Sequence, residues 1–553
     1  MIAHGRVGRA ALVGILLSLA LAGAGFISNV RTADSASLGA LAPPPAPLIP
    51  TPTSTSHGSR KFPGPFVVVL VVDAARYDEF NLAQMPNLAR LAASGVQYSQ
   101  AWVGQLPSVT EASHASIGTG VLPNRHNILG DTWRVPGTEQ MSPNLLNSQL
   151  TRTGYIGKVI KQTGVSSLAA ITHLRWPGSK VVALSGHKVY AADALGAGSA
   201  DYVAFGAKDA RGHFVPNAIP GHEFASSILK SPQLDLPSYP RLPGQEDNWT
   251  TTLALKFLFQ YHPRLMMINL PEVDVFGHIS GTDATVMQPL MSNVDKQIGR
   301  LVAAYGRAGI LPQTTFVITS DHGMVPALHT VDSEQIKSIV LKAGGDPLYI
   351  GHGDSSSIWL KNPETIQKVK TALVDANIPD VAAVYARSPK GNYVLASPIS
   401  RLADPAAASS QIALLSTLNV AESPDIVLVY DENTITMTPG FLKIGRKGDH
   451  GGATWGAQHI PLIINGPRIK KGLVSSYPAR LIDIAPTVEA LLETYPLKQD
   501  GIPLADAILN PPSGSPAQQS ARGVSLRADV DALQKEAVLR PNTIPVQKRH
   551  IIR

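Results

Sequence analysis

The sequence predicts an α/β fold in which a mostly parallel central sheet is flanked by helices and carries an inserted small α+β lobe. Uninterrupted apolar runs such as FVVVLVV at residues 66–72 are typical of strands that are covered on both faces of a parallel sheet. Amphipathic helical segments separate these runs. Polar residues follow the runs directly, at the sheet edge where α/β proteins bind ligands.

Composition places the chain among folded globular proteins, because 44% of its 553 residues are hydrophobic and 16% are charged. The chain has no cysteine, which excludes disulfides, thiolate metal sites and cysteine nucleophiles. The net charge of +7 reflects basic residues near both ends. Since no central basic stripe is interleaved with aromatic residues, we expect no nucleic-acid partner.

The first thirty residues predict export. Arg6 and Arg9 precede a run without charged residues from 10 to 30, which fits either a cleaved signal peptide or a retained membrane anchor. Residues 31–65 are rich in Pro, Ser and Thr and predict an extended linker. We therefore expect an extracytoplasmic protein that is secreted or attached to the membrane by this segment.

The folded body is expected over residues 66–507. After the first strand, a helix begins at Pro86, and a strand within QYSQAWV leads into PSVTEASHASIGTG at residues 107–120. This second stretch predicts a small-residue helix with Thr110 near its start. The hydroxyl can cap the helix, or it can use the positive potential there to favour its alkoxide.

Three apolar strands end at acidic residues. The first strand is followed by Asp73, and LMMINL leads to Asp274 and His278 in PEVDVFGH. TTFVIT leads to Asp321 and His322 in SDHG. A helix with a continuous apolar stripe separates the last two strands, as expected for neighbouring parallel strands.

The alternation of buried strands and amphipathic helices that predicts the main sheet is interrupted between about residues 345 and 440. SSIWLK, NPETIQKVKTALVDANI, VAAVYAR and DIVLVYD predict the small α+β lobe. The main sheet resumes at KGDHGGATWGAQHIPLIINGP, which places His450 in a glycine-rich loop before a strand. A helix over DIAPTVEALLETY closes the body, and residues 508–553 are expected to form a polar, loosely attached C-terminal tail.

The candidate site residues all lie at expected strand ends or in turns beside them. They are Asp73, Thr110, Asp274, His278, Asp321, His322 and His450. Carboxylate and imidazole ligands without sulfur suit zinc, although manganese or iron can use them too. Six such donors and a hydroxyl suffice for two metal ions about 3.5 to 4 Å apart, with Thr110 as an activated nucleophile.

The order of PSVTEASHASIGTG, DVFGH, SDHG and DHGG resembles the alkaline phosphatase superfamily, in particular the type I phosphodiesterase/nucleotide pyrophosphatase branch and the related phosphonoacetate hydrolases. The resemblance runs from about 66 to 507, with unmatched insertions near 131–260 and 325–440. It implies an alkaline phosphatase-like fold with two zinc ions. One ion would be held by Asp73, Thr110, Asp321 and His322, and the other by Asp274, His278 and His450.

This resemblance implies an exported metal-dependent hydrolase that cleaves phosphodiester or pyrophosphate bonds in a small phosphate ester or nucleotide. Its covalent intermediate would be a phospho-threonine-type adduct on Thr110. Members of the branch commonly place Asn three residues beyond the threonine, whereas this chain has Ser113 followed by His114. We expect Ser113, His114 or a backbone N–H to meet the phosphate oxygen.

Other functions remain open at this point. A phosphomonoesterase needs a further positive clamp, for which Arg76 and Arg125 are candidates, and a phosphonate hydrolase would use the same metal ions. A sulfatase is disfavoured because the Cys- or Ser-x-Pro-x-Arg signature is missing. A non-catalytic surface binding protein with this fold would be expected to lack ligands. Asp449 and Glu272 flank ligands and are expected to orient them.

Overall fold

The computed structural model describes residues 64–539, except 210, 212, 220–227, 229–241, 419, 438–445 and 495. The expected signal or anchor at residues 1–30 and the linker up to residue 63 lie outside the described residues, as does the end of the tail. Within the described part, no helix combines the length and the hydropathy that crossing a bilayer requires.

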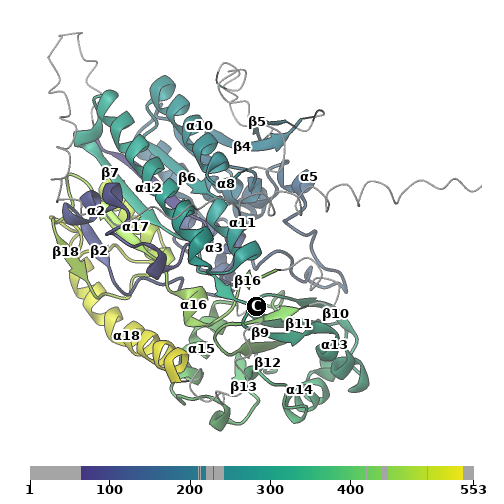
Figure 1. The fold of residues 1–553 in the computed structure, drawn as a ribbon. Helices are drawn as coiled ribbons and strands as arrows, with labels where there is room; N and C mark the ends of the chain where they lie inside the picture. The colour runs from purple at the N-terminus through teal and green to yellow at the C-terminus, as the bar shows by residue number, and fades with distance from the viewer. Residues whose placement is uncertain are drawn as a thin grey trace, which may run out of the picture. The chain divides into compact units, whose positions relative to one another are not determined.

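A nine-stranded sheet forms the centre of the body, which confirms the expected fold class (Figure 1). Its order is β18-β2-β17-β7-β1-β6-β3-β4-β5. The strands from β7 to β4 are parallel, whereas β17 and β5 pair antiparallel with their neighbours. The bounds are β1 (Phe66–Val72), β2 (Val96–Tyr98), β3 (Val181–Ser185), β4 (Tyr202–Lys208), β5 (Phe214–Ala218), β6 (Leu265–Leu270), β7 (Thr314–Thr319), β17 (Leu462–Asn465) and β18 (Leu473–Ser475).

Both faces of the sheet are covered, as the apolar strand β1 predicts. Val68 and Leu70 join one buried core, while Val69 and Val71 join the other. Helices α2 (Pro86–Ala93), α10 (Gln245–Tyr261) and α12 (Ala284–Arg307) supply side chains to the first core. Helices α3 (Thr110–Thr119), α8 (Val189–Gly196) and α17 (Ile484–Leu491) supply the second. Because β1 is packed on both faces, the residues that follow it are held in a defined position at the edge of the sheet.

The stretch 131–260, expected as an insertion, contributes β3, β4 and β5 to the central sheet. β3 pairs in parallel with β6, placing Val182 opposite Met266. The same stretch also forms α5 (Ser148–Thr151), α6 (Tyr155–Gln162) and α7 (Leu168–Arg175). The residues that follow β3 therefore emerge at the same sheet edge as those that follow β1 and β6.

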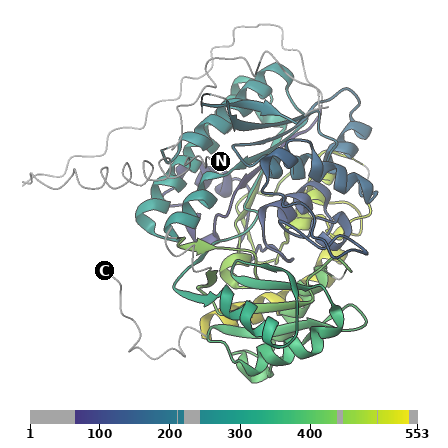
Figure 2. The same cartoon turned by 90° about the vertical axis from the view of Figure 1, so that its right-hand side faces the viewer.

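The expected small lobe is a five-stranded antiparallel sheet of order β10-β11-β14-β12-β13 (Figure 2). Its helices α13 and α14 pack on one face, and α15 shares the core on the other face. The bounds are β10 (Pro347–Gly351), β11 (Ser355–Leu360), β12 (Val381–Arg387), β13 (Tyr393–Leu395), β14 (Ile426–Tyr430), α13 (Ser333–Lys342), α14 (Ile366–Asp375) and α15 (Ala407–Leu415).

Short elements complete the sheet edge that carries the site. A two-residue ladder between β8 (Val325–Pro326) and β16 (Gly448–Asp449) holds the chain just before His450. The remaining elements here are α4 (Pro123–His126), α11 (Glu272–Ser280), β9 (His329–Asp332), β15 (Thr434–Met437) and α16 (Trp455–Gln458).

The C-terminal segment is attached more firmly than expected. Residues Ser515–Leu539 form helix α18, and its buried side chains include Leu526, Val530 and Leu533. These three share one helical face because they are four and three residues apart. They join the same core as α15, so the expectation of a loosely attached polar tail is wrong for this part of the segment.

Candidate active site

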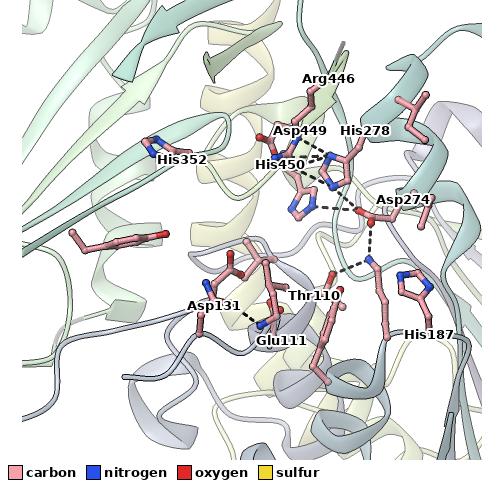
Figure 3. Close-up of a pocket in the computed structure, with 18 residues that line it drawn as sticks. Thr110, Glu111, Asp131, His187, Asp274, His278, His352, Arg446, Asp449 and His450 are labelled. Atoms are coloured by element: carbon pink, nitrogen blue, oxygen red, sulfur yellow. Dashed lines mark hydrogen bonds and ion pairs between the residues drawn. The ribbon is translucent and has the colours of Figure 1, made fainter. Parts of the chain in front are cut away.

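Residues that follow four neighbouring strands, β7, β1, β6 and β3, converge on one site. Figure 3 shows Asp274, His278 and His450 close together at its cavity, with Thr110 beside them. A cavity of about 600 Å³ opens there, and its lining includes Thr110, Lys188, Asp274, His278 and His450. The other expected ligands, Asp73, Asp321 and His322, are fully buried beside it. The structure thus brings together all seven residues singled out from the sequence.

Thr110 is the first residue of α3 and is only 3% exposed. Its Oγ1 lies 3.3 Å from Nε2 of His322 and 3.3 Å from Nζ of Lys188. The hydroxyl therefore faces side chains of the site, and Val109, which precedes the helix, makes no side-chain cap. The helix start adds positive potential at the same oxygen, which favours its ionised form.

The first ligand group comprises Asp73, Asp321 and His322, each of which offers one ligand atom within 4.8 Å of the others. Nε2 of His322 lies 3.3 Å from Oδ2 of Asp321 and 3.9 Å from Oδ1 of Asp73. Ala74 donates its backbone N–H to Oδ1 of Asp321 at 3.0 Å, which leaves Oδ2 to face the histidine.

The second ligand group forms around Asp274. Its Oδ1 lies 3.4 Å from Nε2 of His278 and 3.3 Å from Nε2 of His450. Asp274 and His278 share a face of α11 because they are four residues apart on one helix. Asp449 also offers a ligand atom within 4.8 Å of both histidines.

The two groups are contiguous. The imidazoles of His322 and His450 stack with their ring centroids 3.7 Å apart. Asp274, His322 and His450 likewise place one ligand atom each within 4.8 Å of one another. The two ligand groups therefore form one continuous site with room for neighbouring ions, and not two separate sites.

The donor atoms themselves fit metal ions. Oδ1 of Asp274 and Oδ2 of Asp321 are buried and have no hydrogen-bond partner among the residues that the structure describes. Nδ1 of His322 donates to the carbonyl of Gly323 at 3.0 Å, so its Nε2 carries a lone pair that faces a carboxylate oxygen. Two acceptors this close repel each other, and a cation between them removes the repulsion. Imidazole and carboxylate donors without sulfur suit zinc.

Lys188 also belongs to the site, although no motif in the sequence indicates it. Its Nζ lies 2.7 Å from Oδ1 of Asp73 and 2.6 Å from Oδ2 of Asp274, and the side chain is 4% exposed. The residue stands directly before α8, three residues after β3. The sequence signal for Lys188 is a cation shortly after a buried strand. This signal lies in the stretch 131–260, which was expected to be an insertion.

Burial and charge set the ionisation of these groups. Burial lowers the pKa of His322 to about 3, which keeps the imidazole neutral and able to bind a cation. Burial and the charge of Asp321 raise the pKa of Asp73 well above its usual range. Burial raises the pKa of Asp274 as well, but the ammonium of Lys188, together with His278 and the hydrogen bond from His450, outweighs this effect and holds the pKa well below its usual range.

The chain carries the family signature over most of its folded body. The model of the type I phosphodiesterase/nucleotide pyrophosphatase family matches residues 67–453. The chain belongs to this family. The match runs through the stretches 131–260 and 325–440 that the sequence resemblance had left out, in keeping with the place of β3 and β4 in the central sheet.

Curated proteins of related type match about half of the chain. An uncharacterized pyrophosphatase/phosphodiesterase of Schizosaccharomyces pombe is 23% identical over 49% of this family member and 47% of the relative. An alkaline phosphatase PhoD of Zymomonas mobilis is 25% identical over 47% of this chain and 48% of the relative. The chain thus spans about half the length of these curated relatives.

Solved structures share the fold of this phosphodiesterase family member. Murine ectonucleotide pyrophosphatase/phosphodiesterase 5, in an inactive form in complex with AMP, superimposes with a TM-score of 0.54 at 16% identity. The human protein of the same name gives the same values. Each comparison covers 79% of this chain and 97% of the other, so the alkaline phosphatase-like architecture is confirmed.

Ser113 and His114 lie beside the site, outside the set of described residues that lines the cavity. Both are fully buried in α3. Nδ1 of His114 donates to the backbone oxygen of Thr110 at 2.8 Å and lies 3.4 Å from Oδ2 of Asp321. A role of either residue toward a phosphate oxygen therefore stays a prediction, and the observed contacts of His114 support Thr110 and Asp321.

The other residues considered from the sequence differ in whether they line the cavity. Asp449 accepts from Arg446 at 2.8 Å, and both line the cavity. Glu272 accepts from the backbone N–H of Glu246 and so anchors the first turn of α10. Arg76 and Arg125, considered as clamps, pair with Asp78 and Asp500 respectively.

The cavity wall also includes parts of the chain beyond the ligand groups. The lobe contributes Tyr349 and His352. Glu111, next to Thr110, and Asp131 line the cavity together, and burial, with the neighbouring Asp131, raises the pKa of Glu111 well above its usual range. The wall of the cavity is thus shared between the central sheet and the lobe.

Proposed function

We propose that the protein is an exported metal-dependent hydrolase that cleaves phosphodiester or pyrophosphate bonds through a phospho-threonine-type intermediate on Thr110. The observation that carries this proposal is the position of the Thr110 hydroxyl, at the cavity and 3.3 Å from a ligand atom of His322. Family membership supports the reaction class. The charge pattern of residues 1–30 supports export.

Two divalent ions, zinc by the donor set, are proposed as cofactors. Asp73, Asp321 and His322 would hold one of them beside Thr110, and Asp274, His278 and His450 would hold the other. When bound, such ions withdraw charge from the threonine and phosphoryl oxygens, which is the main requirement of phosphoryl transfer.

The chain's own groups carry the following steps. Oγ1 of Thr110, having lost its proton to solvent, forms a bond to phosphorus while the bond from phosphorus to the leaving oxygen breaks. Lys188 donates from Nζ toward Oγ1 over 3.3 Å and stabilises negative charge on it. Water then attacks the phosphorus of the adduct and gives up a proton, while the bond from phosphorus to Oγ1 breaks and returns the threonine oxygen in its ionised form.

A nucleotide-related phosphate ester is the proposed substrate class. The murine structure with AMP supports it, since its fold covers 79% of this chain. The cavity of about 600 Å³ is within the range that holds small-molecule ligands.

A phosphomonoesterase or phosphonate hydrolase is the second candidate, and Lys188 favours it. A monoester or phosphonate carries one more negative charge than a diester, so it needs a further cation. Lys188 is a buried cation at the ligand groups, whereas Arg76 and Arg125 are engaged elsewhere.

The test compares hydrolysis of bis-p-nitrophenyl phosphate and p-nitrophenyl phosphate by the full chain purified with zinc. Thr110→Ala and a chelator-treated sample should both lose turnover. Thr119→Ala is the matched control, because its hydroxyl bonds to Ala115 at the other end of α3. Faster diester cleavage supports the first function, and faster monoester cleavage supports the second. Turnover that survives in Thr110→Ala, or a chain that binds no metal, contradicts both.

A further inference from the structure

A histidine–glutamate pair borders the cavity outside the ligand groups. Nδ1 of His187 lies 2.8 Å from Oε1 of Glu246, close enough for a direct hydrogen bond from the ring N–H to the carboxylate. The side chain of Glu246 is 4% exposed, while that of His187 is 33% exposed. One partner is thus fixed in the interior and the other reaches the cavity, whose lining includes His187.

The carboxylate is held in place by the fold. Glu246 lies in the first turn of α10, and its backbone N–H donates to Oε1 of Glu272 at 2.9 Å. A Cβ atom at Gly186 would lie only 2.1 Å from Oε1 of Glu246, so glycine is needed where the carboxylate passes. The chain between β3 and α8 is therefore shaped to admit this group.

The pair determines which ring nitrogen meets a substrate. Because Nδ1 is engaged by Glu246, Nε2 is the nitrogen available to a molecule in the cavity. A carboxylate behind an imidazole fixes the tautomer and the orientation of the ring, as in histidines that transfer protons in catalysis. Figure 3 shows His187 on the side of the cavity that carries Asp274.

The position along the chain indicates which part of a substrate His187 meets. Lys188, the next residue, contacts Asp73 and Thr110 and is 4% exposed. His187 is more exposed, so it stands nearer the opening of the cavity. In an in-line displacement the leaving oxygen lies on the side of phosphorus opposite Oγ1 of Thr110, so a substituent that leaves away from this buried threonine extends toward the opening of the cavity.

We propose that His187 is the proton donor for the leaving group and that Glu246 is its positioning residue; this inference rests on the proposed function. Oγ1 of Thr110 bonds to phosphorus, the bond to the leaving oxygen breaks, and that oxygen takes the proton from Nε2. In the second step Nε2 takes a proton from the attacking water, the water oxygen bonds to phosphorus and Oγ1 leaves. The ring then carries its proton again.

The test measures kcat/KM for aryl phosphodiesters whose leaving phenols range from acidic nitrophenol to unsubstituted phenol. In His187→Asn the amide keeps a donor toward Glu246 but has no counterpart to Nε2. The loss should be small for nitrophenol, which leaves without protonation, and about 10² to 10³-fold for phenol. Glu246→Gln should show the same trend with smaller losses.

His173→Asn is the matched control. Nε2 of His173 lies 3.1 Å from Oδ2 of Asp201, and the ring is 32% exposed, but the residue lies outside the cavity lining. Its profile should equal that of the native chain. Equal losses across the leaving groups in both His187→Asn and Glu246→Gln would overturn the proton-donor role alone. Absence of turnover by the metal-loaded native chain would overturn the proposed function and this role with it.

Discussion

The ammonium of Lys188 lies 2.6 Å from Oδ2 of Asp274. The same Nζ lies 2.7 Å from Oδ1 of Asp73, so one buried cation bridges carboxylates that belong to the two ligand groups. Lys188 follows β3 and Asp274 follows β6, and these strands are neighbours in the sheet. The positive charge of Lys188 therefore offsets the negative charges of Asp73 and Asp274 and stabilises the site.

Replacing Lys188 by Met should destabilise the metal-free chain. Removing one partner of a buried ion pair costs about 3–5 kcal/mol of unfolding free energy. Bound zinc should make the loss much smaller, because the ions neutralise Asp73 and Asp274. Denaturant unfolding with chelator and with zinc measures both values. Lys180→Met is the control, since Lys180 forms a more exposed pair with Asp201; an equal loss in both conditions for Lys188→Met would refute the prediction.

Each ligand group should bind its own ion. Asp321→Asn and Asp274→Asn keep the side-chain shape but remove the charge, so each should lower the bound zinc from about two ions per chain to about one. Elemental analysis of gel-filtered protein measures the stoichiometry. Asp500→Asn, at an ion pair with Arg125, should bind as the native chain does. Unchanged stoichiometry in both ligand variants would rule out this assignment.

His126 should make the fold sensitive to acid. Burial lowers its pKa to about 3 from an ordinary 6.5, so the unfolded chain binds the proton more readily than the folded chain. Its stabilising contribution is therefore complete above pH 6.5 and is lost as the pH falls toward 3, by up to about 1.4 kcal/mol per pH unit.

The variant His126→Gln isolates this effect. The difference in unfolding free energy between the native chain and the variant should narrow as the pH falls from 6.5 toward 3. His213→Asn serves as the control because its ring is 49% exposed. A difference that stays constant over this range would show that His126 does not titrate in this way.

Asp354 should support metal binding from behind the His450 loop. Its carboxylate accepts from the backbone of Gly452 and, at 2.7 Å, from the hydroxyl of Thr454. Asp354→Ala should free this loop and weaken zinc binding at the second ligand group about tenfold. Competition with a chromophoric chelator measures the change. The control is Asp346→Ala, an exposed position in the same lobe; equal affinities for Asp354→Ala and the native chain would disprove the support role.

The sequence identified residues whose signal is local. Asp73 and Asp321 follow apolar strands directly, and parallel strands bring such residues to one edge. Asp274 and His278 are spaced for one helix face. These residues can be found from the sequence because their positions depend only on where a strand ends and on the helical repeat.

Residues that depend on strand order could not be found in this way. Lys188 reaches Asp274 only because β3 pairs with β6, and that pairing leaves no mark within either strand. His187 and Glu246 are 59 residues apart and meet through the packing of α10. In α18 the apolar spacing was present at Leu526 and Val530, but polar residues around it concealed the stripe.

The role of Thr110 as nucleophile is tested most directly by peptide mass spectrometry of the zinc-loaded chain after acid quenching during turnover of a phosphodiester. The peptide containing Thr110 should gain the mass of the transferred phosphoryl group with its retained substituent, and Thr110→Ala should show neither the gain nor turnover. Turnover by Thr110→Ala at the native rate, with no adduct on the native Thr110 peptide, would show that Thr110 is not the nucleophile.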